Sequence, residues 1–156
     1  MKNQEDLFLF CSSTTWTGLS SIATFLAVIV ALFLPLILDH VKRSNIKKSV
    51  EIETKYNLNL LVKAESCKNG NLNGQLISRI NLMVAVLVNL RVDVWEDNKQ
   101  IMAGISSELF AKHYEINNLI KDIQKQSNEI YINKGNSPWV AILEDEVKKC
   151  ISLITK

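Results

Sequence analysis

The chain has 156 residues, with 18 Lys and Arg against 16 Asp and Glu, which gives a formal net charge of +2. Its five Gly, two Pro and three Cys exclude a collagen, a disulfide scaffold and a disordered chain. A charge so close to balance also argues against the dense basic face that duplex nucleic acid requires. We therefore expect no duplex nucleic acid among the partners.

Residues 19–38, LSSIATFLAVIVALFLPLIL, form an apolar segment without a single charge. At about 1.5 Å per residue a helix of this length spans about 30 Å, the hydrocarbon thickness of a bilayer. The segment is long for a signal peptide, the MKNQED before it is not basic, and LPLILDH has no small-x-small cleavage site. The sequence thus predicts an uncleaved transmembrane helix, which excludes a fully soluble enzyme.

Charge is unevenly distributed on the two sides of this segment. Residues 1–18 hold one Lys and two acids, whereas residues 39–50 hold four Lys or Arg and one acid. Lys and Arg concentrate on the cytoplasmic side of membrane helices. We therefore expect a single-pass membrane protein, with a short N-terminus outside at 1–18 and a cytosolic domain at 39–156.

Small residues repeat along one face of the apolar segment, where Ala23, Ala27 and Ala31 follow one another at four-residue spacing. Such spacing lets helix backbones approach closely and favours lateral association. Alternatively, alanine is simply common in membrane helices, and the spacing leaves both interpretations open. Because the segment has no ionisable residue, we expect no ion or proton path through it.

Periodicity predicts an all-α fold with about four helices in the cytosolic domain. The first continues from the apolar segment, with a candidate interruption at Ser44 and Asn45, and the breaks after it follow Gly, Asn and Pro. The run from Leu82 to Val88 is apolar on all sides and is compatible with a buried helix or a buried strand. In chain order, we expect helices over 41–68, 75–96, 98–132 and from 138 onward, with loops at 69–74 and 134–138.

Motifs that carry catalysis or metal binding are missing from the sequence. There is no CxxC, HExxH, P-loop or GxSxG, and neither His40 nor His113 has a ligand partner at helical spacing. We therefore expect no enzyme, no catalytic residue, no metal and no cofactor.

An anionic ligand needs only a few converging donors. Arg91 and Trp95 are four residues apart in the predicted 75–96 helix, so a guanidinium and an indole would share one face. Arg79 lies nearer the start of that helix and is a second candidate. The structural alternative is that Arg91 pairs with Asp93 or Glu96.

Two further sets of residues are candidates for binding or assembly. Ser137 is a good N-cap for the last helix, whose first N–H groups suit an anion, and Trp139 beside it offers a ring for stacking. Trp139 could equally be the first core residue of that helix. Asn81 and Asn89 lie in the most apolar part of the chain, where an amide needs partners; we expect them at a subunit interface, with a ligand contact as the alternative.

The layout WTGLSSIATFLAVIVALFLPLIL, KRSNIKK and NLMVAVLVNLRVDVWEDN resembles that of the small accessory membrane proteins of bacterial type III CRISPR systems. The resemblance covers the whole chain in layout and includes no diagnostic motif. It implies a protein of the bacterial inner membrane, a helical cytosolic domain that binds cyclic tetra-adenylate, a tetramer, and a role in antiviral defence. Copies that share one membrane topology can be related only by cyclic symmetry.

Three functions follow as hypotheses. The first is an antiviral effector that senses a cyclic oligoadenylate and perturbs the membrane through its transmembrane helices. The second is an interaction subunit that docks a partner protein on the 98–132 helix or on Leu82–Val88. The third is a holin-like toxin that acts on the membrane without a ligand.

Overall fold

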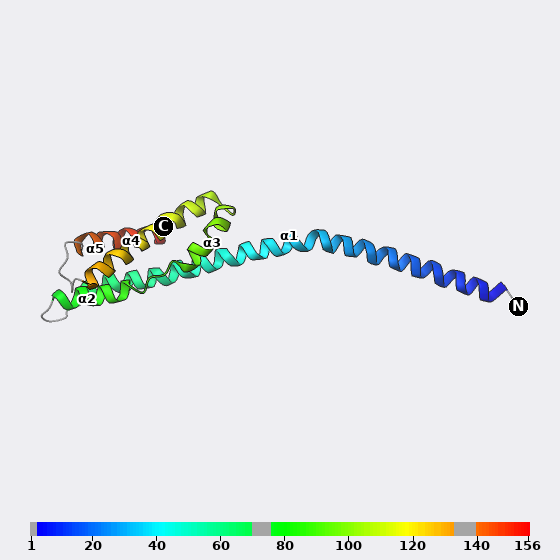
Figure 1. Cartoon of the computed structure of the whole chain (residues 1–156), viewed down its shortest axis with the longest axis horizontal. Coiled ribbons are helices and arrows are strands. Elements are labelled where there is room, and N and C mark those ends of the chain that lie inside the picture. Colours follow the sequence, from blue (N-terminus) through cyan, green and yellow to red (C-terminus); the bar gives the residue numbers. More distant parts are fainter. Residues whose placement is uncertain (1–2, 70–75, 133–139) are drawn as a thin grey trace. The chain divides into compact units, whose positions relative to one another are not determined.

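The computed structural model describes residues 3–69, 76–132 and 140–156. Every regular element in these ranges is an α-helix, which confirms the all-α prediction and resolves Leu82–Leu87 as helix. The chain divides into two compact units, Met1–Lys42 and Arg43–Lys156, and the division falls inside the first helix. The helices are α1 Asn3–Asn69, α2 Leu76–Leu87, α3 Asp93–Ala103, α4 Ser107–Ile132 and α5 Val140–Thr155 (Figure 1).

The first unit consists of the N-terminal part of α1. From Gly18 to Val41 every side chain is exposed except the half-buried Ile29. By length and composition, α1 is the one helix in the described part of the chain that is able to cross a membrane. Its most apolar stretch is not buried at all in the chain, unlike the core helix of a soluble protein. The helix runs through Pro35 and through Ser44 and Asn45 without a break.

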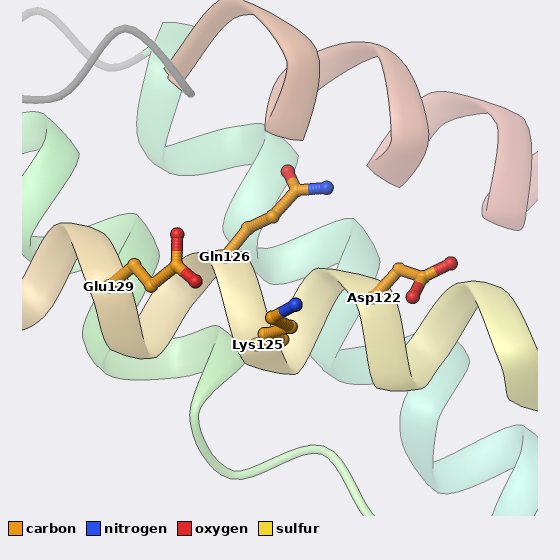
Figure 2. Close-up of a pocket in the computed structure, with 4 residues that line it drawn as sticks. All are labelled: Asp122, Lys125, Gln126 and Glu129. Atoms are coloured by element: carbon orange, nitrogen blue, oxygen red, sulfur yellow. The ribbon is translucent and has the colours of Figure 1, made fainter.

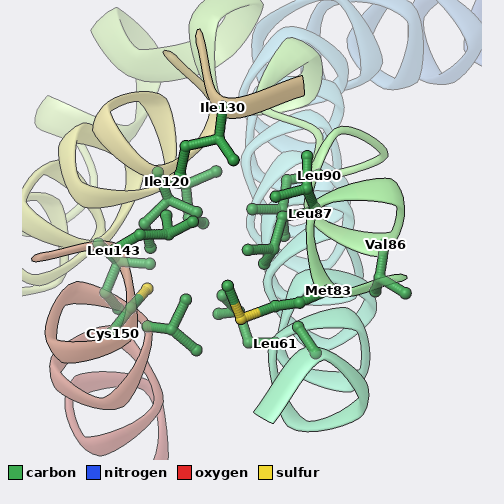
Figure 3. Packing of buried hydrophobic residues seen from close by; sticks show 14 residues of the cluster. Leu61, Met83, Val86, Leu87, Leu90, Ile120, Ile130, Leu143 and Cys150 are labelled. Atoms are coloured by element: carbon green, nitrogen blue, oxygen red, sulfur yellow. The ribbon is translucent and has the colours of Figure 1, made fainter. Parts of the chain in front are cut away.

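The second unit is a helical bundle in which α4 packs against α2, α3 and α5. Its main core draws on α1, α2, α4 and α5, and Figure 3 shows Ile120 and Leu143 on one side of it, opposite Leu61 and Leu87. On α4 the core positions recur at intervals of three, four and seven residues, the pattern of one helix face. The buried set is Leu61, Ala64, Met83, Val84, Val86, Leu87, Leu90, Ile116, Ile120, Ile123, Ile130, Leu143, Val147 and Cys150.

A smaller second core lies around Trp95, which is buried with Val50 and Met102. The indole ring of Trp95 is 5.5 Å from the ring of Phe110 and 6.0 Å from the ring of His113, centroid to centroid. This cluster joins α1, α3 and α4, because Val50 belongs to α1 and the ring partners of Trp95 belong to α4.

Two of the predicted helices are each split by a short connection. The prediction of one helix over 75–96 is wrong, because the chain leaves the helix after Leu87 and re-enters it at Asp93. The prediction of one helix over 98–132 is also wrong, since α3 ends at Ala103 and α4 begins at Ser107. The second break has a local cause, because the Ser106 hydroxyl accepts a hydrogen bond from the Leu109 N–H at 3.3 Å and so caps α4.

Candidate functional site

The connection between α2 and α3, residues 88–92, is held by side chains from other helices. Asn57 of α1 is fully buried, and its Nδ2 donates to the Arg91 carbonyl oxygen at 2.6 Å. The Arg91 N–H donates in return to Asn57 Oδ1 at 2.9 Å. From α4, Gln124 Nε2 donates to the Leu90 carbonyl oxygen at 2.6 Å. These bonds satisfy backbone groups that would otherwise lack a partner once the helix has ended.

The start of α3 is capped by a carboxylate from α1. Val92 stands at the N-cap position and forms no side-chain cap. Instead, Glu53 Oε1 accepts from the Val94 N–H at 2.9 Å, and Glu53 Oε2 accepts from the Trp95 N–H at 3.0 Å. A negative charge is favourable at this end of a helix, where free N–H groups and the macrodipole are both positive. Glu53 therefore caps α3 from a distant helix, in place of the Ser, Asp or Asn that usually caps a helix from the adjacent residue.

A pocket of about 360 Å³ opens beside this connection. Over it the Arg91 guanidinium carbon lies 5.1 Å from the centre of the Tyr56 ring, a cation–π contact. Both side chains are exposed, and the part of the chain that the structure describes contains no acidic partner for the guanidinium. The pocket is lined by Ser49, Ile52, Glu53, Tyr56, Arg91 and Val94.

The chemistry of this pocket suits an anion attached to an apolar or flat group. A guanidinium that lies against a ring still directs its N–H donors outward in its own plane, where a phosphate or carboxylate can accept two of them. Glu53 also carries charge, but each of its oxygens already accepts a backbone N–H. Ile52 and Val94 supply an apolar wall. We refer to these lining residues as the Arg91 pocket.

Arg91 and Trp95 do not form the expected pair on one helix face. Arg91 precedes α3, whereas Trp95 lies within it and is only 1% exposed. A ring that is buried between Phe110 and His113 cannot stack on a ligand. Tyr56 provides the ring beside Arg91 instead, and sequence reasoning missed it because it comes from a helix 35 positions earlier in the chain.

The structural alternative for Arg91, an ion pair with Asp93 or Glu96, is not found among the described residues. Lys99 Nζ lies 2.7 Å from Glu96 Oε2, and Lys121 of α4 donates to the other carboxylate oxygen. The hydrogen bonds from Lys121 and then Lys99 lower the pKa of Glu96. Glu96 is thus engaged by two lysines, which leaves Arg91 facing its pocket.

The structure places the other predicted site residues apart from the Arg91 pocket. Arg79 is half-buried on α2 and does not line it. Asn81 and Asn89 are exposed on the single chain, and Asn89 Nδ2 donates to the Ala85 carbonyl oxygen at 2.8 Å. Their place at a subunit interface stays a prediction. Ser137 and Trp139 lie outside the described residues.

The alanines of the apolar segment are exposed along α1, at positions 23, 27 and 31. Thr24 beside them donates its hydroxyl to the Ser20 carbonyl oxygen at 2.8 Å, so a hydroxyl in this apolar stretch is satisfied within the helix. Association through these alanines also stays a prediction.

A second pocket, of about 160 Å³, lies along α4 and is lined by Asp122, Lys125, Gln126 and Glu129 (Figure 2). Gln126 Nε2 donates to Glu146 Oε2 of α5 at 2.8 Å. With two carboxylates and one ammonium, this pocket has no converging donors for an anion. Within the described residues, no group of three His, Cys, Asp or Glu could hold a metal ion.

Comparison of the chain with protein-family models, with curated proteins and with solved structures gave no match.

Proposed function

We propose that this protein is a membrane-anchored sensor, in which residues 19–38 cross the bilayer and the helical domain 43–156 binds an anionic ligand at the Arg91 pocket. The observation that supports the membrane part is the exposure of the apolar stretch of α1, whose most apolar window is not buried against any described part of the chain. Leaving this much apolar surface in water would be costly, whereas lipid tails cover it.

The ligand in this proposal is a cyclic oligoadenylate, with cyclic tetra-adenylate as the first choice. The resemblance to the accessory membrane proteins of type III CRISPR systems suggests this ligand and antiviral defence as its context. The chemistry of the site also supports this ligand, because Arg91 offers phosphate-binding donors next to an apolar wall and an aromatic ring. In a cyclic homo-oligomer, each copy would contribute one such guanidinium to a ligand with repeated phosphates.

The route from ligand to membrane in this proposal is α1 itself. Glu53 and Asn57, which hold the connection bearing Arg91, belong to the same helix as residues 19–38. A ligand that moves Arg91 would therefore act on α1 through these hydrogen bonds. Perturbation of the membrane is then the output, and no catalytic step is required.

The membrane part can be tested with the cysteines of the chain. A variant with Cys67→Ser and Cys150→Ala retains only Cys11, which the proposal places outside. A membrane-impermeant maleimide should label it in intact spheroplasts, in a protein that sediments with membranes and resists carbonate extraction. Labelling only after lysis would reverse the orientation, and a protein released by carbonate would contradict the anchor.

The ligand part can be tested on the full-length protein in lipid nanodiscs. Cyclic di-, tri-, tetra- and hexa-adenylate are titrated separately, together with linear tetra-adenylate. The proposal expects saturable binding that is strongest for cyclic tetra-adenylate. A folded protein that binds none of them would contradict the sensor function, and membrane damage by residues 1–42 alone would favour the holin-like alternative.

A further inference from the structure

We infer that Asn57 is the positioning residue that sets the Arg91 guanidinium over Tyr56, an inference that rests on the proposed function of the Arg91 pocket. Asn57 holds both backbone polar groups of Arg91, through Nδ2 to the carbonyl oxygen at 2.6 Å and through Oδ1 to the N–H at 2.9 Å. With the N–H and C=O of one residue fixed, the direction of its Cα–Cβ bond is fixed as well. The side chain of Arg91 therefore leaves the backbone in a set direction.

The position of Tyr56 connects these two hydrogen bonds of Asn57 to the Arg91 pocket. Tyr56 and Asn57 are neighbours on α1, so the ring and the amide that orients its guanidinium partner are set by one helical turn. Residue 57 points into the protein and is fully buried, whereas Tyr56 is 38% exposed at the pocket. One short segment of α1 thus supplies both the ring that the Arg91 guanidinium contacts and the amide that bonds to the Arg91 backbone.

Two further side chains restrict the backbone on either side of Arg91, one in the connection and one at the start of α3. Gln124 holds the carbonyl of Leu90, and Glu53 holds the N–H groups of Val94 and Trp95. Asn57 is the member of this set that bonds to Arg91 itself. Gln124 and Glu53 would fix the path of the chain, and Asn57 would fix the orientation of the residue that faces the ligand.

A second buried asparagine provides the matched control. Asn117 of α4 is 2% exposed, and its Nδ2 donates to the His113 carbonyl oxygen of the same helix at 2.8 Å. Replacing either asparagine by leucine removes a buried amide. Only Asn57→Leu removes bonds to Arg91.

The test measures the Arg91–Tyr56 geometry without any ligand, by NMR of the full-length protein in detergent micelles. The Tyr56 ring shifts the side-chain protons of Arg91 upfield through its ring current, and Tyr56→Leu gives the value without the ring. We expect Asn117→Leu to retain the wild-type shifts and Asn57→Leu to move most of the way to the Tyr56→Leu value. Wild-type shifts in a folded Asn57→Leu protein would overturn the inference.

A second variant covers the case in which Asn57→Leu does not fold. Asn57→Asp retains an acceptor for the Arg91 N–H but places a carboxylate oxygen against the Arg91 carbonyl oxygen, and the two repel. The upfield shift of the Arg91 side-chain protons should therefore decrease substantially. An unchanged shift in Asn57→Asp would overturn the inference equally.

Binding of cyclic tetra-adenylate then separates this inference from the proposed function. If the wild type binds, Asn57→Leu should weaken the affinity by about tenfold or more, while Asn117→Leu should leave it near the wild-type value. Equal affinities of the wild type and Asn57→Leu would overturn the role in binding. If the wild type binds none of the cyclic oligoadenylates, the proposed function fails, and the ring-current shifts still decide whether Asn57 orients Arg91.

Discussion

Asn57 forms two hydrogen bonds to the backbone of Arg91, although 34 positions of sequence separate them. Through this pair α1 determines where the connection between α2 and α3 runs and which way its arginine faces. The connection contains no Gly or Pro that would require a break there. Contacts between distant residues end the helix at this point, and the candidate site arises from the same contacts.

Tyr56 should contribute to ligand binding as a ring rather than through its hydroxyl. Tyr56→Phe retains the cation–π contact with Arg91, whereas Tyr56→Leu removes it, at a cost of about 0.5–1 kcal/mol for an exposed pair. Titration of the full-length protein with cyclic tetra-adenylate should therefore give near wild-type affinity for Tyr56→Phe and a few-fold weaker affinity for Tyr56→Leu. An equally large loss of affinity in both variants would contradict this and show that the hydroxyl carries the effect.

Glu53→Gln should destabilise the helical domain. Glutamine offers one acceptor oxygen where Glu53 offers two, and it removes the charge that favours the start of α3. We expect a loss of about 1–3 kcal/mol in the free energy of unfolding, measured by chemical denaturation in detergent and followed by circular dichroism. Glu115→Gln, at an exposed position on α4, is the control and should change little. Equal stability of the two variants would contradict the capping role of Glu53.

Ser127→Ala should stabilise the protein. The Ser127 side chain is fully buried on α4, and its hydroxyl has no hydrogen-bond partner in the described structure. Removing an unsatisfied buried hydroxyl should raise the free energy of unfolding by about 1 kcal/mol, visible as a higher Tm. Ser152→Ala serves as the control, because its exposed hydroxyl donates to the Lys149 carbonyl oxygen at 2.9 Å. A lower Tm for Ser127→Ala would show that the hydroxyl has a partner after all.

His113 should make the stability depend on pH near neutrality. Burial lowers the pKa of His113, Lys112 and Lys47 lower it further, and Glu51 opposes them. The folded protein therefore binds a proton less readily than the unfolded chain, whose histidine pKa is about 6.5. Stability should be full above that value and decrease as the pH falls from about 6.5 towards the lower folded pKa.

Measuring the free energy of unfolding between pH 7.5 and 5 tests the predicted direction of this pH dependence. The wild type should lose stability as the solution becomes more acidic, and His113→Gln should lose less over the same range. A wild type that gains stability on acidification would contradict the stated cause, since it would require a raised pKa.

Local patterns were sufficient for part of the structure. The charge-free run 19–38 and the apolar spacing on α4, at Ile116, Ile120 and Ile123, are properties of single segments, and both predict helix. Gly104 followed by Ser106 is also a local signal, of a helix end and a new cap, and it could have shown where α3 gives way to α4.

Predicting the Arg91 pocket requires information that single segments of the sequence do not contain. Glu53 bonds to Val94 and Trp95 across 41 and 42 positions, and Gln124 reaches Leu90 across 34. Periodicity describes which face of a helix is buried and is silent about which distant backbone it meets. The choice of Trp95 as the ring beside Arg91 failed for this reason, since an unbroken helix was assumed where these contacts end one.

Arg91 is the residue proposed to bind the ligand. The dissociation constant of cyclic tetra-adenylate for the full-length protein in nanodiscs, compared with that of Arg91→Ala, tests this directly. Lys63→Ala, at an exposed position of α1 outside the pocket lining, controls for the loss of a surface charge. We expect binding by the wild type and by Lys63→Ala, and no measurable binding by an Arg91→Ala protein with wild-type helix content. Unchanged affinity in Arg91→Ala would contradict this proposal.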